Sequence, residues 1–322
     1  MDIAPSESGV TPAITTRGLT KRFGKVLALD GLDLEIPRGI VFGLLGPNGA
    51  GKTTTIRLLT GLARPTDGSA TVAGVPVRFG DGLEARRRVG VLDQDPRFYG
   101  WMTGRELLAF VADLVGVPRA DVGARVAATL DRVGLTDAAG RRISGYSGGM
   151  RQRLGIGQAL IGEPDLLILD EPVSSLDPEG RRDLLALIGD LRQSATVVFS
   201  THVLSDVERV CDRVAILDQG QLVIESPIDE LLGRFAPPVY IVEADPGPGL
   251  AIAGLAARLE REPWVGEVTV IGTTLRVAVT DEARATRELL PAIVATGVSI
   301  AAFRRKRPSL EDVVLQLVGR DA

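Results

Sequence analysis

One segment constrains the fold more than any other. Residues 46–53 fit the pattern GxxxxGK[ST], and they lie between an apolar segment, 40–45, and a segment of helical periodicity, 52–62, that ends at Gly61. A glycine-rich loop at such a junction turns backbone N–H groups towards phosphate oxygens, and the helix N-terminus adds partial positive charge. The sequence therefore predicts an α/β domain in which strand, phosphate-binding loop and helix follow one another.

Two residues of this loop have expected roles of their own. Lys52 is long enough to reach the β- and γ-phosphates, and the Thr53 hydroxyl is a ligand for magnesium. A plain glycine turn is the alternative, but a chance match is expected in only about one chain in two hundred. The residues predicted to bind the nucleotide here are Gly46, Pro47, Asn48, Gly49, Ala50, Gly51, Lys52, Thr53 and Thr54.

The elements predicted around the loop alternate between strand and helix, which is typical of a parallel sheet. From residue 102 to 140, apolar side chains recur at helical spacing, so we expect a helical insertion there. Strands are predicted at 14–19, 26–36, 40–45, 166–169, 196–199 and 214–217, and helices at 178–191 and 203–210.

A second alternation follows the Ala-Pro-Pro stretch at 236–238. Its strand, helix, strand, strand, helix, strand order is compatible with a small α+β domain of ferredoxin-like fold. The elements are expected at 239–244, 250–260, 267–271, 275–280, 281–295 and 298–303, with a last helix at 309–318. The predicted parts are a disordered tail at 1–12, a nucleotide-binding domain at 13–235 with its helical subdomain at about 100–160, and an accessory domain at 239–322.

Composition narrows the classes of protein. Of 322 residues, 45% are hydrophobic and 24% are charged, which excludes a wholly disordered, collagen-like or coiled-coil chain. The net charge of −4 argues against a surface devoted to nucleic-acid phosphates. The single cysteine, Cys211, cannot form an internal disulfide, and no apolar stretch approaches the roughly 18 residues of a membrane span. We therefore expect a cytoplasmic chain that does not itself cross a bilayer.

Three polar side chains follow predicted strands at the sheet edge where ligands bind in parallel sheets. Asp170 and Glu171 follow the strand at 166–169, and His202, the single histidine, follows the strand at 196–199. Asp170 is suited to hold magnesium through water, Glu171 to deprotonate the attacking water, and His202 to donate a hydrogen bond to the γ-phosphate. Taken separately, Asp170 and Glu171 could equally be a solvated strand end, and His202 a structural histidine. Together with the phosphate-binding loop, these residues indicate phosphoryl transfer.

Ser147, Gly148 and Gly149 precede a segment of helical periodicity at 150–161. Ser147 is suited to cap that helix, and the glycines leave its first N–H groups accessible, so a second anion site is expected. Alone the signal is weak, because Ser-Gly-Gly is also an ordinary turn.

The order and spacing of these motifs resemble the ATP-binding subunit of an ABC transporter, over about residues 14–232. Residues 46–53 resemble the Walker A loop, Asp170 and Glu171 the Walker B motif, and residues 146–150 the family signature. The signature departs from its usual form at Tyr146 and Met150. His202 resembles the switch histidine, Gln94 the Q-loop glutamine, Asp177 the end of the D-loop, and Phe23 the ring that stacks on adenine.

The resemblance implies a P-loop ATPase with an antiparallel β subdomain, which uses ATP and Mg²⁺ and works as a head-to-tail sandwich of two subunits. Ser147, Gly148 and Gly149 of one subunit then complete the site of the other. The implied catalytic residues are Lys52, Gln94, Glu171 and His202. The implied metal ligands are Thr53, Gln94 and Asp170. The nucleotide contacts add Phe23, Asp177 and the loop residues.

The same resemblance implies partners and a location. The expected partners are a separate multi-span transmembrane permease and either a second copy or a related ATPase subunit, with no nucleic acid. The expected location is the cytoplasmic face of the cell membrane. Residues 239–318, which contain Arg-Pro-Ser-Leu-Glu-Asp-Val at 307–313, are similar to the extra domain of drug-resistance-type exporters, which implies export. Their basic run at 304–307 is either a solvated turn or a site for anionic lipid or an acidic partner.

Two alternatives remain at this stage. A soluble ABC-type ATPase acting on nucleic acid or ribosomes would share the ATP site, but the interval from Thr53 to Asp170 is too short for a long coiled-coil insertion and the chain has one phosphate loop. A P-loop kinase would leave Ser147, Gln94 and His202 as coincidences.

Overall fold

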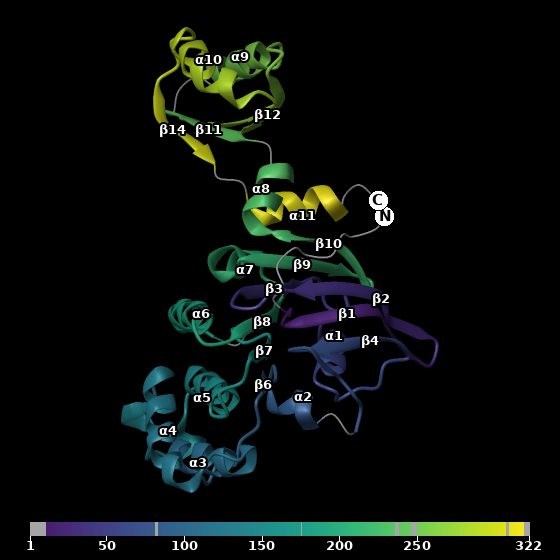
Figure 1. Ribbon diagram of the computed structural model, residues 1–322. Helices are drawn as coiled ribbons and strands as arrows, with labels where there is room; N and C mark the ends of the chain where they lie inside the picture. Colours follow the sequence, from purple (N-terminus) through teal and green to yellow (C-terminus); the bar gives the residue numbers. More distant parts are fainter. Residues whose placement is uncertain are drawn as a thin grey trace. The chain divides into compact units, whose positions relative to one another are not determined.

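The computed structural model describes residues 11–80, 83–174, 176–235, 238–245, 250–306 and 309–318 (Figure 1). Most of the predicted tail, 1–10, lies outside these residues. The chain divides into two compact units, one up to Ile228 and one from Asp229 onward. This division falls at the start of helix α8 (Ile228–Phe235), whereas the sequence analysis assigns residues up to 235 to the first domain.

A six-stranded sheet forms the centre of the first unit, in the order β10-β9-β3-β8-β7-β6. The strands β6, β7, β8, β3 and β9 pair in parallel, and β10 pairs antiparallel with β9. Every residue of β3, β7 and β8 is buried, as expected for central strands covered on both faces. The bounds are β3 Val41–Leu45, β6 Val89–Leu92, β7 Leu166–Asp170, β8 Thr196–Thr201, β9 Arg213–Asp218 and β10 Gln221–Pro227.

Helices connect these strands as predicted. The first, α1 (Lys52–Leu59), is shorter than the predicted segment because its C-cap is Thr60 and Gly61 has a φ of +67°. A short helix, α2 (Leu83–Arg87), precedes β6. Helices α6 (Pro178–Leu191) and α7 (Leu204–Val210) precede β8 and β9. The parallel α/β core predicted from the alternation is therefore confirmed.

A second, antiparallel sheet has the order β2-β1-β4-β5. Its strands are β1 (Ile14–Phe23), β2 (Val26–Ile36), β4 (Asp67–Val72) and β5 (Val75–Pro76). β1 is longer than predicted, since register shifts after Thr16 and Leu19 allow it to continue beside β2 as far as Phe23. Apolar residues of this sheet, α1 and the central sheet share one core that includes Ile14, Leu34 and Leu44. This shared core fixes the position of the β1–β2 hairpin, which reaches the phosphate-binding loop at 46–53.

The predicted helical insertion consists of α3 (Gly104–Val115), α4 (Arg119–Arg132) and α5 (Gly148–Leu160), which group together in Figure 1. α3 begins with a capping box in which Thr103 and Glu106 bond each other's backbone N–H. Those bonds lower the pKa of Glu106. α3 and α4 are separated at Gly116, whose φ of +85° ends the first helix.

The second unit has the predicted ferredoxin-like order of elements. Its antiparallel sheet is ordered β12-β13-β11-β14, and a core that includes Trp264 and Leu289 lies between the sheet and two helices. The bounds are β11 Val239–Ala244, α9 Leu250–Leu259, β12 Val265–Ile271, β13 Thr274–Val279, α10 Glu282–Val294, β14 Ile300–Lys306 and α11 Leu310–Val318.

The main difference from the sequence prediction in this unit concerns the basic run at 304–307. β14 was predicted to end at residue 303, but it continues to Lys306, so the described part of the run is not a turn. Arg304 and Arg305 form ion pairs of 2.6 Å with Glu243 and Glu282, and Lys306 contacts Asp312 at 2.8 Å. Arg307 lies outside the described residues.

Candidate active site

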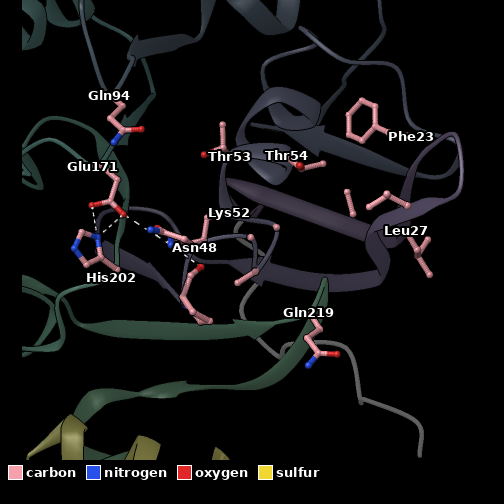
Figure 2. A pocket seen from close by; sticks show the side chains of 16 residues that line it. Phe23, Leu27, Asn48, Lys52, Thr53, Thr54, Gln94, Glu171, His202 and Gln219 are labelled. Carbon is pink, nitrogen blue, oxygen red and sulfur yellow. Dashed lines mark hydrogen bonds and ion pairs between the residues drawn. The ribbon is translucent and has the colours of Figure 1, made fainter.

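A cavity of about 630 Å³ opens at the start of α1 (Figure 2). Residues from six separate parts of the chain line it. They are Phe23, Val26, Leu27, Ala28, Pro47, Asn48, Gly49, Ala50, Gly51, Lys52, Thr53, Thr54, Gln94, Glu171, His202 and Gln219. The structure thus brings together most residues that the sequence analysis assigned to nucleotide binding, although these are up to 179 positions apart (Phe23 to His202).

Glycine is required at two positions of the loop. Gly46 has a φ of +155°, and a Cβ there would lie 2.3 Å from the carbonyl oxygen of Leu217. Gly51 has a φ of +106°, and its Cβ would lie 2.9 Å from the carbonyl oxygen of Ala28. The loop is therefore seated directly against other backbone segments. No side chain caps α1 after Gly51, so the first N–H groups of that helix remain available for an anion.

Lys52 is held beneath the loop. Its Nζ donates hydrogen bonds to the carbonyl oxygens of Gly46 at 2.6 Å and Pro47 at 3.2 Å, and lies 3.8 Å from Glu171 Oε1. Burial lowers the pKa of Lys52, while the nearby charges of Glu171 and Asp170 oppose that shift. The loop backbone thus fixes an ammonium group at the charged end of the cavity.

Glu171 lies between two nitrogen-bearing side chains. His202 Nδ1 is 3.0 Å from each carboxylate oxygen, and Lys52 Nζ is on the other side (Figure 2). Glu171 is buried and has a φ of +46°, a left-handed conformation that is uncommon outside glycine. A carboxylate held in this way at a cavity wall is suited to accept a proton from water.

Asp170 and Thr53 provide a pair of oxygen ligands beside the loop. Thr53 Oγ1 donates a hydrogen bond of 3.2 Å to Asp170 Oδ2. Hydroxyl and carboxylate oxygens are the ligands that Mg²⁺ prefers, and Mg²⁺ is commonly held by one or two protein groups with phosphates and water. Among the described residues there is no group of three or more His, Cys, Asp or Glu that would form an all-protein metal site. The donor set therefore fits magnesium that is bound together with phosphate.

The other end of the cavity is apolar and aromatic. Phe23 and Leu27 lie opposite Glu171 and His202, with Lys52 and Thr53 between them (Figure 2). Phe23 is 50% exposed, and Lys21 Nζ lies 4.8 Å from the centre of its ring. An exposed ring at one end and cationic groups at the other match a nucleotide with its base on Phe23 and its phosphates on the loop.

The sequence analysis missed several cavity residues. Val26 pairs directly with Phe23 across the β1–β2 hairpin, and this pairing brings residues 26–28 to the aromatic end of the cavity. Gln219 follows β9 and carried no recognisable motif. Ser200 was also missed: it bonds Asp170 and Glu171 although it does not line the cavity. It is the next-to-last residue of β8, two positions before His202, which follows the strand.

The signature residues are not part of this cavity. Ser147, Gly148, Gly149 and Asp177 are absent from its lining within the described residues. Ser147 caps α5 as predicted, with its Oγ accepting a 3.3 Å hydrogen bond from Met150 N–H. The predicted cap is therefore present, whereas an anion site at the start of α5 stays a prediction, and Ser147, Gly148 and Gly149 do not line the cavity with Lys52 and Glu171.

Two contacts hold the signature region within the helical subdomain. The hydroxyl of Tyr146 donates a 2.8 Å hydrogen bond to the carbonyl oxygen of Ala138, which accommodates tyrosine where leucine is usual. Gln152 on α5 donates a 3.3 Å bond to the carbonyl oxygen of Gln94. Gln94 thus lines the cavity and also contacts the helix that follows the signature.

No helix among the described residues is long and apolar enough to span a membrane. The ABC transporter family model matches residues 29–174, and the model for the C-terminal domain of DrrA1-3-like ATP-binding proteins matches residues 227–318. The daunorubicin/doxorubicin resistance ATP-binding protein DrrA of Streptomyces peucetius is 35% identical over 319 residues, which cover 97% of this chain and 94% of the relative.

Two further comparisons agree with this match. The Nod factor export ATP-binding protein I of Cupriavidus pinatubonensis is 36% identical over 332 residues, which cover 99% of this chain and 95% of the relative. Among solved structures, cbiO1 from Clostridium perfringens, part of the ABC transporter complex cbiONQ, aligns with a TM-score of 0.65 at 26% identity. That alignment covers 70% of this chain and 92% of cbiO1.

Proposed function

This chain belongs to the ABC transporter ATP-binding proteins, with a DrrA-type C-terminal domain, and is an ATPase subunit of a membrane transporter; we propose that the transporter is an exporter whose membrane-spanning part is a separate chain. The observation that carries the proposed chemistry is the placement of Glu171 between Lys52 and His202 at the charged end of the cavity. Export is supported by two relatives that match nearly the whole chain, one of which is a Nod factor export protein and the other a drug-resistance protein.

In the proposed mechanism the loop binds the phosphates and Phe23 stacks on adenine. The uncapped N-terminus of α1 and the Lys52 ammonium neutralise the β- and γ-phosphates. The remaining loop residues from Gly46 to Thr54, apart from Pro47, which has no N–H, contribute backbone N–H groups and the hydroxyls of Thr53 and Thr54. Together these contacts fix the γ-phosphate near Glu171.

Glu171 is the proposed general base. Its carboxylate orients a water molecule for attack on the γ-phosphate and takes the proton, while His202 donates a hydrogen bond to the phosphate as charge develops there. The bond between His202 Nδ1 and Glu171 holds both side chains at the same wall. Gln94, which also lines the cavity, senses the γ-phosphate and passes its presence to α5 through Gln152.

Magnesium is the proposed metal, held by Thr53 and by Asp170 through water, with Gln94 as a further ligand. When bound it would neutralise charge on the β- and γ-phosphate oxygens. The fit rests on the Thr53–Asp170 oxygen pair beside the phosphate loop.

The site is proposed to be completed by a second subunit, either an identical copy or a related ATPase chain. Its Ser147, Gly148 and Gly149 would bind the γ-phosphate from the opposite side, and its Asp177 would lie at the interface. The separation of the α5 N-terminus from the cavity within one chain supports this arrangement. No nucleic-acid partner is proposed.

The proposed location is the cytoplasmic face of the cell membrane, reached through the membrane-spanning partner that docks on the helical subdomain. We also propose the ranges 13–235 and 239–322 for the ATPase and accessory domains, with α8 as the segment that joins them.

Co-purification tests the partner directly. Tagged Glu171→Gln protein is purified with ATP from detergent-solubilised membranes, and the co-purifying proteins are identified by mass spectrometry. A stoichiometric multi-span membrane protein is expected. Recovery only from the soluble fraction, together with ribosomes or nucleic acid, would contradict the proposed partner.

A further inference from the structure

Ser200 is a buried hydroxyl that contacts both residues of the acidic pair. It lies on β8 and is 0% exposed. Its Oγ donates a hydrogen bond to Asp170 Oδ1 and accepts one of 3.0 Å from the backbone N–H of Glu171. One side chain therefore connects Asp170, the last residue of β7, and Glu171, which follows it, to the strand that precedes His202.

Asp170 is held from two directions. Its Oδ2 accepts the hydrogen bond from Thr53, and its Oδ1 accepts the one from Ser200. Thr53 is itself a proposed metal ligand, whereas Ser200 does not line the cavity. Because Ser200 does not line the cavity, its hydrogen bond to Asp170 does not depend on what the cavity binds. Such outer partners orient the groups that hold a metal.

Ser200 also holds the backbone at Glu171. The Glu171 N–H lies 3.0 Å from Ser200 Oγ and 3.2 Å from the carbonyl oxygen of Ser200. These contacts are made where Glu171 has its φ of +46°, a conformation that persists in a non-glycine residue only when the surroundings enforce it. The carboxylate that projects from this backbone is the one placed between Lys52 and His202.

We propose that Ser200 is a positioning residue for ATP hydrolysis: its hydroxyl fixes Asp170 for the metal and fixes the backbone from which Glu171 reaches the attacking water. The inference rests on the roles proposed above for Asp170 and Glu171. Ser200 itself touches neither nucleotide nor water in this account, and it acts only through the two acidic residues.

The test is Ser200→Ala in the full-length protein. Removing the hydroxyl is expected to lower kcat by about 10–100-fold, the usual effect of losing an outer partner of a metal-holding group. The loop and Lys52 are untouched, so any rise in KM for Mg²⁺-ATP should not exceed the loss of Mg²⁺-dependent affinity described below. A second readout does not depend on turnover: ATP affinity is measured by calorimetry in Mg²⁺ and in EDTA, with Glu171→Gln as the background.

In that background, Ser200→Ala should leave the affinity in EDTA unchanged within about twofold and reduce the gain in affinity that Mg²⁺ provides by about tenfold. A residue that only supports folding would lower thermal stability and change both affinities together. Ser200→Cys keeps the volume but offers only a weak donor and acceptor, so it should shift both readouts in the same direction. If Ser200→Ala cannot be recovered in folded form, both measurements are made on Ser200→Cys instead.

Thr196→Val is the matched control. Thr196 lies at the opposite end of β8, is 2% exposed, and its Oγ1 accepts a 3.1 Å hydrogen bond from the N–H of Gly39. At about 3.3 Å per residue it is roughly 13 Å from Ser200. The substitution removes a buried hydroxyl from the same strand without touching Asp170 or Glu171, so kcat and the Mg²⁺ effect should stay at the wild-type level.

Two results would overturn the inference. One is a kcat and Mg²⁺ dependence at the wild-type level in whichever Ser200 variant is recovered folded. The other is an equal loss in Thr196→Val. Failure of the proposed function is distinguishable, because it would be seen as missing hydrolysis in the wild type or undiminished hydrolysis in Glu171→Gln.

Discussion

The charged end of the cavity and the start of α5 are the two anion sites predicted from the sequence, and they differ in how many functional groups surround them. At the cavity, residues from α1, β7 and β8 converge: Lys52 and His202 approach Glu171, and Thr53 approaches Asp170. At α5, Ser147 caps its own helix, and Gly148 lines a smaller cavity with Gln94, but neither glycine lines the cavity that holds Lys52, Glu171 and His202. This difference supports the proposal that the two halves of the site on one chain meet their counterparts only between chains.

The largest effect is expected from Glu171→Gln, which removes the proton acceptor and preserves the shape of the side chain. Hydrolysis should fall by about 10²–10⁴-fold, the usual contribution of a general base. ATP binding should persist, because Lys52 and the loop remain. Phosphate release and ATP binding are measured on the same preparation, and undiminished hydrolysis would refute the role of Glu171.

Gly149→Asp tests the half of the proposed two-chain site that residues 147–149 provide, with little disturbance to the fold. A Cβ at Gly149 would lie 3.6 Å from Leu176 Cδ2, an ordinary contact, and a carboxylate near a helix N-terminus is tolerated. Facing a γ-phosphate, the same charge costs several kcal/mol, so hydrolysis should fall by about 10²–10³-fold.

The control for Gly149→Asp is the binding of ATP to dilute, monomeric protein, which should be unchanged. Weakened binding under those conditions would mean that α5 contacts the nucleotide within its own chain. Hydrolysis at the wild-type level would mean that the signature does not meet a phosphate at all.

Lys52→Met separates binding from catalysis at the cavity. The substitution removes an ammonium that the loop carbonyls of Gly46 and Pro47 hold in place, and retains most of the side-chain length. Losing a charge-assisted contact with phosphate should weaken ATP affinity by about 10–100-fold. Calorimetry with the non-hydrolysed Glu171→Gln protein as reference measures this, and equal affinities would contradict the placement of the phosphates.

Phe23→Ala is expected to have the smallest effect. Base stacking on an aromatic ring contributes about 1–3 kcal/mol, and the half-exposed Phe23 should lie at the low end, so ATP affinity falls about fivefold. Phe23→Tyr retains the ring and should bind as the wild type does. A loss of hydrolysis at saturating ATP in Phe23→Ala would place the ring nearer the chemistry than the account allows.

The sequence predicted the polar side chains of the candidate site better than it predicted the residues that surround them. The phosphate loop, Asp170, Glu171 and His202 could be placed because parallel strands deliver their carboxyl ends to one edge, a rule that needs no knowledge of distant packing. Residues 26–28 could not, since their position depends on the β1–β2 hairpin and on the core it shares with α1. Ser200 reads as an ordinary strand residue until its partners on β7 are known.

The same distinction holds for the fold, where the order of the elements was easier to predict than their ends. The strand and helix order of both units followed from apolar periodicity, but element ends depended on tertiary contacts. β14 extends through Arg304 and Arg305 because these residues pair with Ile241 and Tyr240 of β11, and a run of basic residues alone does not reveal such partners. α1 ends early because Gly61 adopts a positive φ.

Mixing two inactive variants tests most directly whether one site is built from two chains. Glu171→Gln and Gly149→Asp proteins are assayed separately and as an equimolar mixture. In a head-to-tail dimer each mixed pair contains one intact site, so the mixture should recover roughly a quarter of the wild-type hydrolysis rate per chain if the sites act independently. A mixture no more active than its components would contradict the account, because both halves of the site would then have to come from the same chain.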